Sequence, residues 1–104
     1  MKIQLNTDVH INGTESLAAQ VSATIEQALE NFSERVTRVE VHLSDENGDK
    51  SGQQDQRCML EARLKGLQPV AVTDHAATLD QAVNGAAQKL EHLLSSTLGR
   101  LHEH

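Results

Sequence analysis

The feature that most constrains the fold is a long apolar stripe near the end of the sequence. Apolar residues recur there at spacings of three and four, the period of one helix face; they are Leu79, Val83, Ala86, Leu90, Leu93, Leu94, Leu98 and Leu101. Thr78 and Gln81 fit a capping box at the start of this stripe. The pattern predicts an amphipathic helix over residues 79–102, which at 1.5 Å per residue is about 36 Å long.

Two glycines lie inside this predicted helix. Gly85 and Gly99 each weaken it by about 1 kcal/mol relative to alanine. We expect Gly85 to permit close packing on a sheet or on another helix, and Gly99 to let the helix end fray. A seven-residue strand spans only about 23 Å, so the helix should extend beyond any sheet it covers.

Four segments alternate between apolar and polar residues, which is the period of a strand with one buried face. They cover residues 2–6, 39–43, 57–64 and 70–73, and Pro69 is placed at the start of the fourth because it has no N–H to donate. The polar stretch at residues 45–56 predicts a long hairpin loop. An amphipathic segment that begins at Thr14 or Ser16 and ends near residues 31–33 predicts a first helix.

The predicted order is therefore β-α-β-β-β-α, a single α+β domain over residues 1–104. Each strand has one apolar face and each helix one apolar stripe, so both helices should pack on one face of a four-stranded sheet. Such an arrangement is double-stranded-RNA-binding-domain-like. The opposite face of the sheet is then open to solvent.

Composition limits the chemistry of the chain. Cys58 is its single cysteine, which excludes an intrachain disulfide, and its inward strand position favours an inert buried thiol over a reactive one. The histidines are scattered, without the spacing of a metal site, and no glycine-rich phosphate loop is present. We expect no enzyme activity, no cofactor and no small-molecule substrate. The lack of a leader or a membrane-length apolar run predicts a cytosolic protein without membrane contact.

The charge balance is acidic. Nine Lys and Arg residues against fifteen Asp and Glu residues give a formal net charge of −6. Because an acidic protein is repelled by nucleic acid on average, any RNA contact requires a local cluster of cations. Such a cluster is predicted on the open sheet face, where the outward positions hold Lys2, Arg38, Arg57 and Arg63, with Lys65 at the adjoining turn.

Glu40 and Glu61 share this predicted face, which leaves two interpretations. The face is either an RNA-binding patch or a solvated surface of cross-strand ion pairs, each worth about 0.2–1 kcal/mol.

Several segments together resemble the short ribosome hibernation-promoting and ribosome-associated inhibitor factors, the sigma-54 modulation protein family. They are residues 1–5, the strand at 39–43, and the last helix with Ala82-Val83 followed by Lys89-Leu90. The resemblance extends from Ile3 to about Leu101. It implies a protein that docks on the small ribosomal subunit, in the channel of messenger and transfer RNA, and silences or protects idle ribosomes.

The resemblance also implies that lysine and arginine side chains contact rRNA phosphates. Lys89 and Arg100 match basic positions of the family's last helix, whereas His92, Ser96 and Leu98 stand where the family is often basic. The residues expected to contact phosphate are Lys2, Arg38, Arg63, Lys65, Lys89 and Arg100.

A rival hypothesis is a protein-interaction module on the same scaffold that has lost affinity for rRNA. Such a module would hold a protein partner through its terminal leucine stripe or through the acidic face of the first helical segment, which has four glutamates and no cation. A homodimer through Leu94, Leu98 and Leu101 is a related expectation; the alternative is that the first helix and the loops cover these leucines.

Overall fold

The computed structural model describes residues 1–46 and 56–102, with side chains described up to residue 99. Most of the predicted hairpin loop, residues 47–55, lies outside the described residues. The elements in chain order are β1 (Lys2–Thr7), α1 (Glu15–Ala28), a single 3-10 turn η1 (Glu30–Phe32), β2 (Val36–Asp45), β3 (Gln56–Leu64), β4 (Val70–Ala76) and α2 (Leu79–His102). This order confirms the predicted β-α-β-β-β-α fold, and α2 has the predicted bounds.

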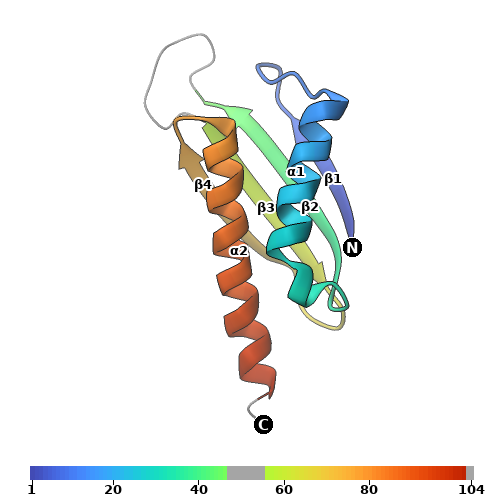
Figure 1. Cartoon of the computed structure of the whole chain (residues 1–104). Coiled ribbons are helices and arrows are strands. Elements are labelled where there is room, and N and C mark those ends of the chain that lie inside the picture. Colours follow the sequence, from blue (N-terminus) through green and yellow to red (C-terminus); the bar gives the residue numbers. More distant parts are fainter. Residues whose placement is uncertain (47–55, 103–104) are drawn as a thin grey trace.

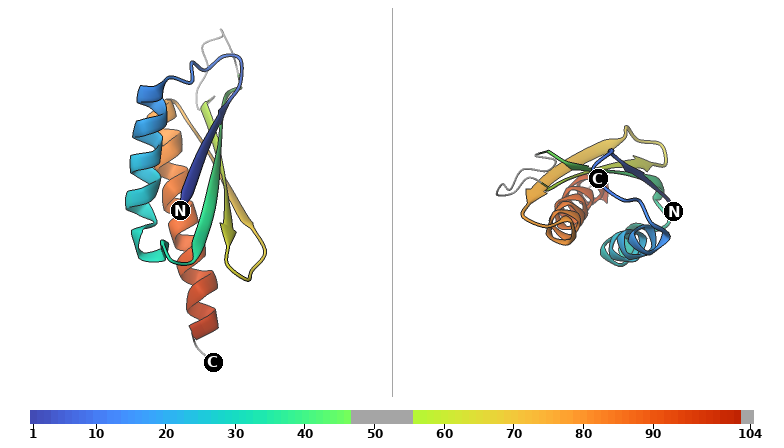
Figure 2. Two further views of the ribbon diagram at one scale, coloured as in Figure 1. Left: turned by 90° about the vertical axis from the view of Figure 1, so that its right-hand side faces the viewer. Right: turned by 90° about the horizontal axis from the view of Figure 1, so that it is seen from above.

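The four strands form one sheet in the order β1-β2-β3-β4. β1 pairs with β2 in parallel, and the two other pairs are antiparallel. Both helices cover the same face of this sheet (Figures 1 and 2). We call the other side of the sheet the open face.

The core lies between the helices and the sheet, and it is aliphatic. On the strands it is built from alternate residues, such as Val39 and Val41 of β2 and Leu60 of β3, all 0% exposed. Ile25 of α1 and Leu90 of α2 are likewise 0% exposed and belong to the same cluster. Among the described residues no polar or charged residue is buried, so the core depends on apolar burial alone.

A β-bulge at the start of β2 extends this strand beyond the predicted segment. Val36 pairs with Leu64 and Arg38 with Arg63, so Thr37 is the extra residue in the ladder. The Thr37 hydroxyl donates to the Arg63 carbonyl at 3.2 Å. Because the bulge adds one residue to the alternation, Val36 enters the core while Arg38 reaches the open face.

Both helices begin with threonine caps. The Thr14 hydroxyl accepts from the Leu17 backbone N–H at 3.0 Å, and the Thr78 hydroxyl accepts from that of Gln81 at 3.1 Å. α1 is shorter than predicted because its last turn, η1, is a 3-10 helix.

The last part of α2 extends beyond the sheet, as the helix length predicted (Figure 1). Leu94 and Leu98 are nevertheless 0% and 5% exposed within the single chain, and Phe32, Arg35 and Leu98 line one shallow hollow between η1 and α2. Both leucines are therefore covered within the single chain, which leaves them little apolar surface for a dimer contact. The side chain of Leu101 lies outside those described.

Gly85 is the point of closest approach between α2 and the edge strand β4. A Cβ atom at this position would lie 1.9 Å from Oδ2 of Asp74, whose side chain points toward the helix. Asp74 in turn contacts Lys89, one helical turn beyond Gly85, with 2.9 Å between Nζ and Oδ1. The expected close packing at Gly85 is thus packing on the sheet.

We predict that alanine changes the free energy of unfolding in opposite directions at the two helical glycines. Gly85→Ala should lower the free energy of unfolding by about 1 kcal/mol, because the strain of displacing Asp74 exceeds the gain in helix propensity. Gly99→Ala, which meets no atom within 4 Å, should raise it by up to about 1 kcal/mol. Urea unfolding monitored by circular dichroism measures both.

The double variant Gly85→Ala/Asp74→Ala is the control, since it removes the carboxylate that the new methyl group would meet. It should be more stable than Asp74→Ala alone. Equal stabilisation by alanine at both glycines in the otherwise unchanged chain would contradict the assigned contact.

Candidate nucleic-acid interface

Three cations face one another across three strands of the open face. Lys2 of β1 is the register partner of Arg38 of β2, and Arg38 is the register partner of Arg63 of β3. Neighbouring strands lie about 4.8 Å apart, so this cation row (Lys2, Arg38 and Arg63) spans roughly 10 Å. Lys65 follows just beyond β3, where its backbone N–H donates to the Arg35 carbonyl at 2.9 Å. Four of the six predicted phosphate contacts therefore lie at one end of the open face.

A second row, of carboxylates, runs beside the first. Glu40 of β2 is the register partner of Glu61 of β3. Side chains of like charge thus face one another across the strands, which is unfavourable in both rows. For these four residues the expected cross-strand ion pairs do not form, because the register aligns Arg38 with Arg63 and Glu40 with Glu61.

The ion pairs of Arg38 and Arg63 run along their own strands instead. Arg38 Nη2 lies 3.0 Å from Glu40 Oε1 within β2, and Arg63 Nη2 lies 3.9 Å from Glu61 Oε1 within β3. Arg38 also donates to the side-chain carbonyl of Gln4 on β1. Nothing in the sequence indicated this role for Gln4, because it depends on the parallel pairing of β1 with β2.

Lys2 and Lys65 are the exposed cations at the margin of this cluster. In the described part of the chain, neither of them makes an ion pair, in contrast to Arg38 and Arg63. Their ammonium groups are therefore available to an outside anion at this end of the open face.

Lys89 occupies a different place. Its ammonium group donates to the Thr73 carbonyl at 2.9 Å and contacts Asp74, so it connects α2 to the edge strand β4. The structure does not bring Lys89 together with the cation row, which crosses β1, β2 and β3. The side chain of Arg100 is not among those described, so its predicted contact stays a prediction.

The opposite end of the open face holds a mixed cluster. Glu46 Oε1 lies 3.7 Å from Arg57 Nε and 3.6 Å from His75 Nε2. Arg57 and His75 are register partners on β3 and β4, so one carboxylate lies near two potential cations. Pairs this exposed contribute little to stability.

The candidate metal ligands and the single thiol of the chain are the other groups that the sequence singles out. No three His, Cys, Asp or Glu side chains gather closely enough among them to hold a metal ion. Cys58 is 0% exposed, and burial, reinforced by the charge of Asp74 and partly opposed by that of Arg57, raises the pKa of its thiol to about 12. The thiolate that nucleophilic attack requires is therefore not formed at neutral pH.

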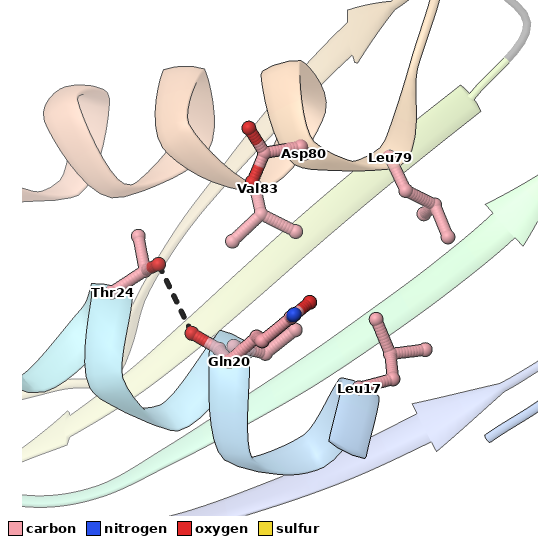
Figure 3. A pocket seen from close by; sticks show the side chains of 7 residues that line it. Leu17, Gln20, Thr24, Leu79, Asp80 and Val83 are labelled. Carbon is pink, nitrogen blue, oxygen red and sulfur yellow. Dashed lines mark hydrogen bonds between the residues drawn. The ribbon is translucent and has the colours of Figure 1, made fainter. Parts of the chain in front are cut away.

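A hollow of about 210 Å³ lies between α1 and α2 (Figure 3). Leu17, Val21, Leu79 and Val83 form its apolar part, and Asp80 is the one ionisable residue that lines it. The Thr24 hydroxyl at its edge is already bound to the Gln20 carbonyl at 3.0 Å. The hollow has no cation to meet a phosphate, so it does not extend the candidate interface.

Comparison with known proteins supplies a family for this arrangement. The family model described as sigma 54 modulation protein / S30EA ribosomal protein matches residues 5–102. No curated protein sequence gives a significant match. Within the described residues, no helix is both long and apolar enough to cross a membrane.

Two solved structures share the fold. The N-terminal domain of Protein Y from Thermus thermophilus superposes with a TM-score of 0.75 at 18% identity, over 93% of this chain and 99% of that one. A ribosomal subunit interface protein from Coxiella burnetii superposes with a TM-score of 0.79 at 12% identity, over 95% of this chain and 99% of that one. At these identities the likeness establishes the fold.

The buried thiol provides a test of the packing under α2. We predict that Cys58 resists a thiol reagent at pH 8 in the folded chain and reacts promptly in denaturant. The pKa of this thiol is about 12 in the folded chain and ordinarily 9.0. Its contribution to the free energy of unfolding is therefore complete below pH 9 and is lost as the pH rises from 9 toward 12. Fast stoichiometric labelling of the native chain would contradict the burial. Cys58→Ala has no thiol to ionise, so its stability should fall less than that of the wild type between pH 9 and 12.

Proposed function

Because this chain belongs to the sigma 54 modulation protein / S30EA ribosomal protein family, we propose that it binds the small ribosomal subunit through rRNA phosphates and silences or protects idle ribosomes. The family is one of ribosome-associated factors and is not enzymatic. The Coxiella burnetii protein of the same fold is named for the ribosomal subunit interface, which agrees with a site of action there. Such a role implies a cytoplasmic location.

The observation that carries the proposal is the cation row on the open face. The formal net charge of −6 opposes binding to a polyanion, so the contact has to be local. Lys2, Arg38, Arg63 and the adjacent Lys65 supply four positive charges on one exposed end of the sheet, where no helix stands between them and a partner. Lys89 and Arg100 are the further contacts that the family resemblance implies, and Lys89 must leave Asp74 to make one.

The ion pairs within the face do not exclude this binding. Exposed pairs of this kind are worth about 0–1 kcal/mol, and a phosphate is as good an acceptor for a guanidinium group as a carboxylate. Each cation that neutralises a phosphate releases counterions from the RNA, so the affinity should fall as salt rises.

A second candidate is a protein-interaction module that has lost its affinity for rRNA. The observation that favours it is the pairing of Arg38, Arg63 and Lys89 with carboxylates. The two candidates differ in their response to salt, because a phosphate contact strengthens at low ionic strength whatever the pairing.

We predict that the chain sediments with purified small ribosomal subunits at low salt and progressively less as salt is raised. Lys2→Ala and Lys65→Ala should each reduce the slope of log affinity against log salt by about 1. Arg57→Ala, which makes the same change in net charge at the other end of the face, is the matched control and should change the slope less. Absence of binding at low salt would reject the ribosomal proposal in favour of the interaction module.

A homodimer through Leu94, Leu98 and Leu101 is a separate hypothesis about partners. Light scattering at high protein concentration tests it, with Leu101→Ser as the variant that should dissociate a dimer without opening the core at Leu94. A strict monomer at the highest soluble concentration removes the hypothesis.

A further inference from the structure

We propose that the ion pairs Arg38–Glu40 and Arg63–Glu61 are autoinhibitory: Glu40 and Glu61 occupy the guanidinium groups that would otherwise bind RNA phosphate, and so set the affinity of the open face. We call them the autoinhibitory pairs. The inference rests on the proposed function and concerns the regulation of the same site. It commits to RNA phosphate as the ligand that competes with the two carboxylates.

The register places the four side chains in a square. Arg38 faces Arg63 across the ladder, and Glu40 faces Glu61 two residues further along each strand on the same side of the sheet. Each arginine is therefore beside one glutamate of its own strand and opposite a like charge on the next. The bulge at Thr37 keeps this geometry compatible with a buried Val36, so the square is built into the fold.

The charges of the square cancel, and each member depends on its neighbours. Two facing arginines or two facing glutamates alone would repel one another, and the pairs along the strands offset both repulsions. When a phosphate takes one arginine, the corresponding glutamate loses its partner and faces another carboxylate. Binding of RNA thus carries a cost that a face with neutral residues at positions 40 and 61 would not carry.

The two pairs are held with unequal strength. Arg38 is fixed at 3.0 Å from Glu40 and also donates to Gln4, and the Glu40 side chain is 23% exposed. Arg63 lies 3.9 Å from Glu61, and its side chain is 55% exposed. Arg63 is therefore the first arginine that a phosphate can capture, and Arg38 requires the displacement of two acceptors.

The held conformation of Arg38 leaves a donor unused. Its Nε is buried and has no hydrogen-bond partner within the described part of the structure. A buried donor without a partner is unfavourable. If Arg38 turns toward an RNA phosphate, its Nε gains a hydrogen bond that it lacks while Arg38 is paired with Glu40. Pairing with Glu40 therefore leaves part of the hydrogen-bonding capacity of Arg38 unused.

The test compares binding of a 20-nucleotide single-stranded RNA by Glu40→Gln, Glu61→Gln and the double variant. Glutamine keeps the shape of the side chain and removes its charge. The double variant should bind about three- to tenfold more tightly than the wild type and show a steeper dependence on salt. Glu40→Gln should give the larger single effect, because it releases the more firmly held arginine.

The matched control is Glu26→Gln in α1, an exposed carboxylate that makes no ion pair among the described residues. It makes the same change in net charge but touches no cation of the open face, so it measures the general effect of reduced repulsion. Thermal unfolding of every variant verifies that the fold is retained.

The outcomes separate this inference from the proposed function. If the wild type binds RNA and the variants at positions 40 and 61 bind no more tightly than Glu26→Gln, the autoinhibitory pairs are rejected and the ribosomal proposal stands. If the wild type fails to bind small subunits but Glu40→Gln/Glu61→Gln binds the RNA, the pairs are supported and the ribosomal proposal fails. If neither the wild type nor any variant binds the RNA or the small subunits at low salt, both proposals are overturned.

Discussion

The structure depends on apolar burial on one side of the sheet only. Alternate residues of β2 and β3 enter a core closed by α1 and α2, and none of the described residues on the open face is buried. Since each strand has a period of two, burial of one set of side chains commits the other set to solvent. The functional surface proposed here is therefore a consequence of how the core is closed.

That surface is organised by register rather than by composition. The chain is acidic, yet Lys2, Arg38 and Arg63 meet in one row because the ladders of β1, β2 and β3 align them. The same ladders align Glu40 with Glu61. The result is a face with a positive margin and a nearly neutral interior, which suits a contact that is local, sensitive to salt and limited by competition from its own carboxylates.

The helix layer has a different electrostatic character from that of the sheet. Glu15 and Glu26 of α1 are exposed carboxylates, and Lys89, the described lysine of α2, is engaged by Asp74 on the edge strand. Asp74 occupies an inward position on β4, and Gly85 leaves the space for its carboxylate. An inward charge on an edge strand also discourages pairing with another sheet. Lys89 thus has a structural role in the free chain, where it holds α2 against β4.

The amino-acid sequence by itself determined the type and order of the elements, the bounds of α2 and the side chains that face solvent. These follow from local periodicity and from caps such as Thr14 and Thr78, which act within a few residues. Only the tertiary structure decided that β1 pairs in parallel, that a bulge at Thr37 brings Val36 into the core, and that like charges face one another in rows. Register arises from contacts between segments distant in the chain, so no local pattern reveals which side chains face one another across the sheet.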